Sequence, residues 1–128
     1  MTKDLKFRVK IAAEPEDIYA ALTRPLAIEL WSGYSAKMST EPGSEFELWD
    51  GDISGKNIEF EENFKIVQEW YFGEQDKPSI VTIKLFKQGT KTQIEVNHTN
   101  IPIDDFDDIK EGWVDNYFAA VKDFVEVK

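Results

Sequence analysis

A change in hydrophobic period near residue 102 constrains the fold of this 128-residue chain more than any other feature. Before it, apolar and polar residues alternate in short runs, which is typical of half-buried β-strands. After it, apolar residues recur every three or four positions, which predicts an amphipathic helix of roughly 20 residues, about 30 Å long. The apolar positions of this helix are Phe106, Ile109, Trp113, Tyr117, Ala120 or Val121, and Phe124.

Turn signals divide the preceding region into strands and short helices. A strand is predicted over 5–11, followed by two short helices that begin near Pro15 and Pro25. Asp50-Gly51 is the strongest hairpin signal, since this pair accepts the positive φ angles of a type I′ turn between strands 45–49 and 53–60. Further strands are expected over 64–72, 80–87 and 92–99. Antiparallel strands between helices predict an α+β fold, with the sheet wrapped against the long C-terminal helix.

Composition excludes several classes of protein. Hydrophobic residues make up 41% and aromatic residues 13%, which is too much apolar surface for a disordered chain. The absence of cysteine excludes thiol catalysis and Cys-ligated zinc and fits a reducing cytosol, so we expect a cytoplasmic protein. A net charge of −10 repels phosphate backbones and anionic lipids, so neither nucleic acid nor a membrane is an expected partner. The evenly spread charge and the length predict a single domain over 1–128.

The inventory of catalytic and metal-binding residues is small. His98, the only histidine, could act as a general base, but it follows Ile94 and Val96 on one strand face, so a hydrogen-bonded residue of the core or of a cavity wall is the simpler interpretation. The four aspartates within 104–108 do not have the spacing of a calcium loop and suit the positive end of a helix dipole. We therefore predict no metal, no cofactor and no enzymatic activity.

Two polar residues fall on otherwise apolar strand faces, Gln68 and His98. An unpaired buried polar group costs about 1–3 kcal/mol, whereas a cavity that holds a ligand or water would satisfy both side chains. Trp113 and Tyr117, on the helix stripe, would face the same space. We predict a ligand-binding site formed by Gln68, His98, Trp113 and Tyr117. The alternatives are that Gln68 lies at a bulge or strand end, and that the aromatic residues only fill the core.

Four sequence motifs resemble, in order and spacing, those of the activator of heat shock protein 90 ATPase family. They are FELWDGDISG (46–55), KIVQEW (65–70), TNIP (99–102), and GW (112–113) with YF (117–118). The similarity runs from about Val9 to Phe124 and is greatest to the C-terminal domain of the eukaryotic co-chaperone and to stand-alone bacterial relatives.

The resemblance implies the START-like, birch-pollen-allergen-like helix-grip fold of the SRPBCC superfamily. In this fold a curved antiparallel sheet grips a long C-terminal helix, two short helices close one end, and a cavity lies between sheet and helix. The superfamily includes lipid binders, polyketide cyclases and stress-response proteins.

Two hypotheses from different classes follow. The first is a non-enzymatic module that binds a small hydrophobic ligand in the cavity, or a protein on its surface. The second is an accessory co-chaperone that stimulates a heat shock protein 90 type ATPase and has that chaperone as its partner. The co-chaperone's separate N-terminal domain, which binds the chaperone, is not expected in a chain that starts at Met1. A cyclase-type enzyme ranks third, because only His98 offers proton chemistry near neutral pH.

Overall fold

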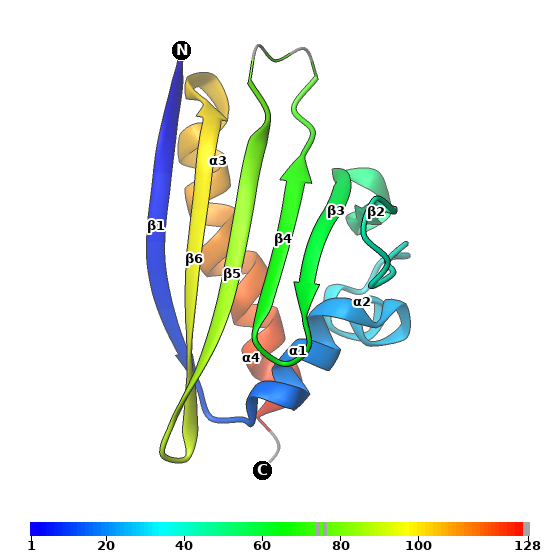
Figure 1. Cartoon of the computed structure of the whole chain (residues 1–128), viewed down its shortest axis with the longest axis vertical. Helices are drawn as coiled ribbons and strands as arrows, with labels where there is room; N and C mark the ends of the chain where they lie inside the picture. Colours follow the sequence, from blue (N-terminus) through cyan, green and yellow to red (C-terminus); the bar gives the residue numbers. More distant parts are fainter. Residues whose placement is uncertain (74, 76, 127–128) are drawn as a thin grey trace.

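A curved six-stranded antiparallel sheet packs around the C-terminal helix (Figure 1). The computed structural model describes residues 1–73, 75 and 77–126. The sheet order is β1-β6-β5-β4-β3-β2, so the first strand pairs with the last. The strands are β1 (Thr2–Ile11), β2 (Glu45–Leu48), β3 (Ile53–Glu61), β4 (Lys65–Trp70), β5 (Ser79–Gln88) and β6 (Lys91–Pro102). The helices and turns are α1 (Pro15–Thr23), α2 (Pro25–Ser32), η1 (Trp49–Gly51), η2 (Ile103–Asp105), α3 (Phe106–Glu111), η3 (Gly112–Phe118) and α4 (Ala119–Val125).

This arrangement confirms the predicted α+β class and the helix-grip fold. Burial alternates along β4 and β5, because one face of the sheet packs on the helix and the other meets solvent. Helices α1 and α2 cover one end of the sheet, where α1 and α2 both contact α4. No helix among the described residues is both long and apolar enough to span a membrane.

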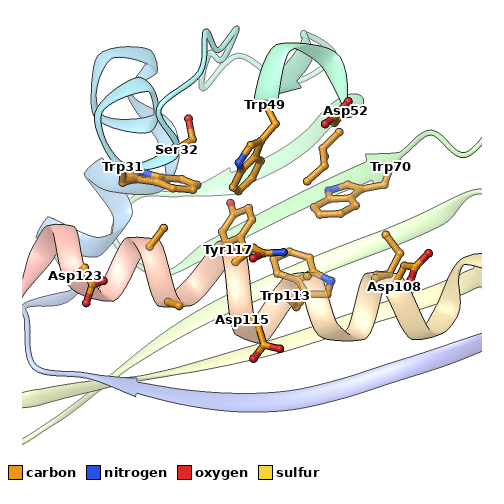
Figure 2. A pocket seen from close by; sticks show the side chains of 16 residues that line it. Trp31, Ser32, Trp49, Asp52, Trp70, Asp108, Trp113, Asp115, Tyr117 and Asp123 are labelled. Carbon is orange, nitrogen blue, oxygen red and sulfur yellow. The ribbon is translucent and has the colours of Figure 1, made fainter.

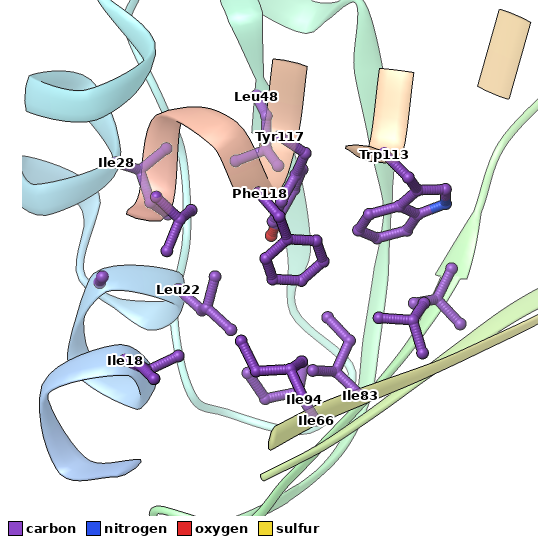
Figure 3. Close-up of a cluster of buried hydrophobic side chains, with 14 of the residues drawn as sticks. Ile18, Leu22, Ile28, Leu48, Ile66, Ile83, Ile94, Trp113, Tyr117 and Phe118 are labelled. Carbon is purple, nitrogen blue, oxygen red and sulfur yellow. The ribbon is translucent and has the colours of Figure 1, made fainter. Parts of the chain in front are cut away.

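The core lies between the inner face of the sheet and the helices. Figure 3 shows side chains from α1 and α2, the sheet and the C-terminal helix meeting in one cluster. Its labelled members are Ile18, Leu22, Ile28, Leu48, Ile66, Ile83, Ile94, Trp113, Tyr117 and Phe118, all 4% exposed or less.

The C-terminal helix has the predicted extent, but its middle is not α-helical. The seven residues of η3 form a π-helical segment, a wider helix that is rare and frequently found at functional sites. Trp113, Tyr117 and Phe118 are all buried there, with 2%, 4% and 1% of their surface exposed. A period of three or four residues predicted the first two but not Phe118, which follows Trp113 by five residues, the spacing of the hydrogen bonds of a π-helix. Phe124, predicted on the same stripe, is 39% exposed.

The β2–β3 hairpin occurs where it was predicted, but its turn differs from the predicted two-residue type I′ turn. Trp49, Asp50 and Gly51 form the turn η1 with φ angles of 51°, 55° and 94°. Two of these residues are not glycine, and a left-handed conformation costs such residues about 1–2 kcal/mol each. Trp49, which was predicted to continue the strand, therefore leaves the sheet at this point.

We predict that replacing Trp113 by alanine lowers the free energy of unfolding by about 3–5 kcal/mol, because it removes a buried indole between sheet and helix. Urea denaturation measures the loss. The adjacent Val114 is 49% exposed and supplies the control, since Val114→Ala should change stability by no more than about 0.5 kcal/mol. Equal denaturation midpoints for the two variants would contradict the packing described.

Candidate functional site: a tryptophan-walled pocket

A pocket of about 880 Å³, open to solvent on one side, lies between the C-terminal helix, α2, the η1 turn and the adjoining ends of β3 and β4. Five aromatic residues from four different elements form its wall: Trp31, Trp49, Trp70, Trp113 and Tyr117. Figure 2 shows their rings in the space between the C-terminal helix and the elements opposite it. The pocket therefore exists only when these distant segments are brought together.

The aromatic rings of the wall contact one another in an unbroken series. Trp70 and Trp113 are stacked, with ring centroids 4.7 Å apart and an angle of 24° between the ring planes. Tyr117 lies 4.7 Å from Trp113 and 5.2 Å from Trp31. Trp49 closes the series at 5.4 Å from Trp31 and 5.9 Å from Tyr117. Such contacts contribute about 0.5–1.5 kcal/mol each beyond the area they bury.

A chain of hydrogen bonds, the Trp113 relay, holds the indole of Trp113 from behind the wall. Its Nε1–H donates to Nδ1 of His98 at 3.1 Å. An indole nitrogen can only donate, so Nδ1 must accept and Nε2 of His98 carries the proton. Nε2 lies 2.8 Å from Oγ of Ser79, whose hydroxyl donates to the carbonyl of Thr99 at 3.0 Å. Every donor and acceptor in the relay is satisfied only while His98 is neutral.

A second chain, the Trp70 relay, holds the other stacked indole in the same way. Nε1–H of Trp70 donates to Oε1 of Gln68 at 3.1 Å, and Nε2 of Gln68 donates to Oδ1 of Asn57 at 3.0 Å. Nδ2 of Asn57 then donates to the carbonyl of Ser39 at 3.1 Å and to Oγ of Ser44 at 3.2 Å. Both stacked tryptophans are thus anchored to the sheet through their only polar atom.

A β-bulge in β3 makes the Trp70 relay possible. Asn57 pairs with Gln68, but the next pair joins Glu59 to Val67, so Ile58 is an extra residue. Asn57 is fully buried while Ile58 is 39% exposed. The alternative prediction placed Gln68 itself at a bulge. The bulge lies instead on the neighbouring strand β3, where it directs the amide of Asn57 toward Gln68.

The four predicted site residues divide into two pairs. Trp113 and Tyr117 line the pocket. Gln68 and His98 face inward as predicted and are 3% and 0% exposed, but they do not line the pocket. Protein groups satisfy their hydrogen bonds, so neither needs the water or ligand that was expected to satisfy it. A contribution of these residues to ligand binding stays a prediction.

The predicted site did not include three of the five wall residues, Trp31, Trp49 and Trp70. Among them, Trp49 is the one whose local structure was also predicted wrongly. It was assigned to a strand, and the Asp50-Gly51 signal was interpreted only as a hairpin turn. The signal that could have identified Trp49 is its position directly before Asp50-Gly51. If the turn begins one residue earlier, the Trp49 side chain leaves the sheet. In Figure 2 the Trp49 ring extends from the η1 turn toward Tyr117.

Burial sets the protonation states of Tyr117, which is part of the wall, and of His98, which lies behind it. Desolvation lowers the pKa of His98 to about 3, although the nearby charge of Asp4 acts to raise it. Desolvation raises the pKa of the Tyr117 hydroxyl well above its usual range. Near neutral pH the imidazole is therefore neutral and the phenol keeps its proton.

The hydroxyl of Tyr117 differs from the polar groups of the two relays. Tyr117 is 4% exposed, and its hydroxyl extends into the space between Trp31 and Trp49 in Figure 2. It has no hydrogen-bond partner among the described residues. Within the same part of the chain, no group of three or more histidine and acidic residues is placed to hold a metal ion.

Solved structures identify the class of protein that this fold defines. A crystal structure of an HSP90 activator from Plasmodium falciparum matches with a TM-score of 0.83 and 24% identity, over 92% of this chain and 92% of that one. The solution structure of the Aha1 dimer from Colwellia psychrerythraea matches with a TM-score of 0.83 and 19% identity, over 98% of this chain and 97% of that one. The chain therefore has the same helix-grip fold as these two proteins.

Within this class, the family model described as Activator of Hsp90 ATPase homolog 1-like protein matches residues 12–126, and the chain belongs to that family. An Activator of 90 kDa heat shock protein ATPase homolog from Dictyostelium discoideum is 32% identical over 124 residues, which are 94% of this chain and 32% of that protein. The corresponding homolog 2 from Mus musculus is 24% identical over 114 residues, covering 88% of this chain and 34% of that protein. The chain spans about a third of the length of these relatives.

We predict that His98 makes stability depend on pH. Its pKa is lower in the folded than in the unfolded chain, so its stabilising contribution is complete above about pH 6.5 and falls by about 1.4 kcal/mol per pH unit as the pH drops toward 3. Urea denaturation between pH 7 and 4 measures this slope.

The variant His98→Gln separates this effect from that of the carboxylates. A glutamine can accept from Trp113 and donate to Ser79 but does not titrate, so the pH slope should be smaller in the variant. The same slope in both proteins, or an imidazole that titrates near pH 6.5 in NMR spectra of the folded protein, would contradict the relay.

Proposed function

We propose that this chain is a non-enzymatic binding module that holds a small hydrophobic ligand in the tryptophan-walled pocket. The observation that supports it most directly is the pocket itself, which combines an aromatic wall with one unpartnered hydroxyl. Its volume of about 880 Å³ falls within the range of roughly 300–1,000 Å³ usual for small-molecule sites. Residues 1–128 act in this proposal as a single START-like domain.

In this proposal the four predicted site residues have two kinds of role. Trp113 and Tyr117 contact the ligand directly, because both line the pocket. Gln68 and His98 are positioning residues that fix the indoles of Trp70 and Trp113 through the two relays. A wall that is ordered before binding lowers the entropy lost when the ligand enters.

The position of His98 supports a non-enzymatic role. Both of its ring nitrogens are hydrogen-bonded within the protein, and it is fully buried behind the wall. A general base must reach the proton that it removes and titrate near the working pH. With a pKa lowered to about 3, His98 offers neither property to a molecule in the pocket.

Binding of a neutral aromatic hydrocarbon, isobutylnaphthalene, tests the proposal. The melting temperature of the protein should rise with the logarithm of ligand concentration above the dissociation constant. Replacing Trp49, which is only half-buried, by alanine should weaken binding about tenfold because it removes one side of the wall.

Phe64→Ala is the matched control, since Phe64 is a 36% exposed aromatic residue that does not line the pocket. It should leave the dissociation constant unchanged. Absence of saturable binding to the wild-type protein, or equal weakening by both substitutions, would overturn the proposal.

A second candidate function is that of an accessory co-chaperone for a heat shock protein 90 type ATPase. Relatives of this chain are named as activators of that ATPase. One surface feature favours a protein partner: Leu26 and Leu30, four residues apart on α2, are 76% and 73% exposed. Residues at this spacing lie on the same face of a helix, so α2 presents an apolar pair to solvent.

For this second function we predict that the purified chain accelerates ATP hydrolysis by a heat shock protein 90. The double variant Leu26→Ser, Leu30→Ser should lose most of the acceleration, because it removes the apolar pair from the surface. Ile103→Ser, at a 44% exposed site in η2, is the control and should keep it. A wild-type chain that leaves the ATPase rate unchanged would exclude the co-chaperone role.

A further inference from the structure

We infer that the pocket selects an organic cation, a protonated amine carried on an apolar or aromatic body. This inference rests on the proposed ligand-binding function and specifies the chemical class of the ligand. The described residues that line the pocket include four aspartates, Asp52, Asp108, Asp115 and Asp123, and no lysine, arginine or histidine. The charged residues that line the pocket are therefore all negative.

The aspartates of the pocket are not committed to other charges. Ion pairs elsewhere in the molecule involve glutamates, such as Glu59 and Glu61 with Lys65. None of the four aspartates forms an ion pair with another residue that the structure describes. Carboxylates beside a cleft with apolar walls concentrate their field in the cleft and attract a cation from solution.

The aromatic wall suits the same kind of ligand. A cation within about 6 Å of a ring centroid is attracted to the negative face of the ring, most strongly to that of tryptophan. The pocket presents four indoles and one phenol, all within a series of contacts no longer than 5.9 Å. An aromatic wall alone would accept any apolar compound. Combined with carboxylates, it favours an apolar compound that carries a positive charge.

Tyr117 supplies an independent observation, because its side chain is 4% exposed and its hydroxyl lacks a partner in the described chain. The hydroxyl oxygen opens to the pocket, where a ligand or solvent can pair with it. Its oxygen can accept the N–H of a protonated amine. Asp52, Asp108 and Tyr117 all line the pocket, and Figure 2 shows Asp108 on the C-terminal helix and Asp52 on the opposite side.

A negatively charged ligand is disfavoured for the same reasons. A hydrophobic anion, such as a fatty acid, would place its carboxylate among aspartates with no cationic side chain among the described lining residues. Burying a charge without a partner is costly. A neutral ligand of the same shape would gain the apolar contacts but neither the ring-face attraction nor the attraction of the carboxylates.

Three naphthalene compounds that share a ring system and differ in charge test this inference. They are the cation dimethyl(naphthylmethyl)ammonium, its neutral isostere isobutylnaphthalene and the anion naphthylacetate. Calorimetric titration at low ionic strength should give the cation a dissociation constant about tenfold below that of the neutral compound, with the anion weakest. The advantage of the cation should shrink as salt screens the aspartates.

Two adjacent residues of α3 provide a matched pair of variants. Asp108 lines the pocket, whereas the exposed Asp107 does not, and both changes to asparagine remove the same charge from the same helix. Asp108→Asn should weaken binding of the cation several-fold and leave the neutral compound unaffected. Asp107→Asn should change neither, which separates the pocket from the general effect of a net charge of −10.

The outcomes distinguish this inference from the function on which it rests. If cation and neutral compound bind equally, or if Asp107→Asn and Asp108→Asn have equal effects, selection of a cation is wrong and the hydrophobic pocket stands. Preferred binding of naphthylacetate would also overturn it. If none of the three compounds binds, the proposed function itself fails. Tyr117→Phe should weaken the ammonium compound and spare its trimethyl analogue, which has no N–H to donate.

Discussion

The stack of Trp70 on Trp113 joins the sheet to the helix, and most of the candidate site depends on it. The two ring centroids are 4.7 Å apart, and each indole N–H begins a hydrogen-bond relay that returns to the sheet. The polar atoms that could have weakened this buried contact instead fix its geometry. Loss of one member of a relay would leave a buried group unpaired, at a cost of about 1–3 kcal/mol.

Two departures from regular backbone geometry complete the pocket on either side of this stack. The π-helical segment η3 carries the wall residues Trp113 and Tyr117, and the left-handed residues of η1 place Trp49 against Tyr117. Both conformations are less favourable than a regular helix or strand and persist because surrounding packing determines them. That both adjoin one pocket is in keeping with a role for the pocket in function.

Helix α2 connects the two functions proposed for this member of the activator of Hsp90 ATPase family. Its Trp31 is 8% exposed and belongs to the pocket wall, whereas Leu26 and Leu30 face solvent. A ligand in the pocket and a protein partner on the leucine pair would thus contact different faces of one short helix. Binding of the ligand and binding of the protein partner would each affect the position of α2.

The sequence alone determined the order of elements, the length of the final helix and the inward direction of Gln68 and His98, because these follow from local hydrophobic period. Only the tertiary structure decided what those side chains meet. Gln68 bonds to Asn57 across a bulge, 11 residues away, and His98 lies between Ser79 and Trp113, 19 and 15 residues away. Such partners depend on strand register and on where the helix packs. The local hydrophobic period of the sequence gives no information about either. The place of Trp49 in the wall was likewise decided by a turn whose left-handed residues the tertiary contacts hold.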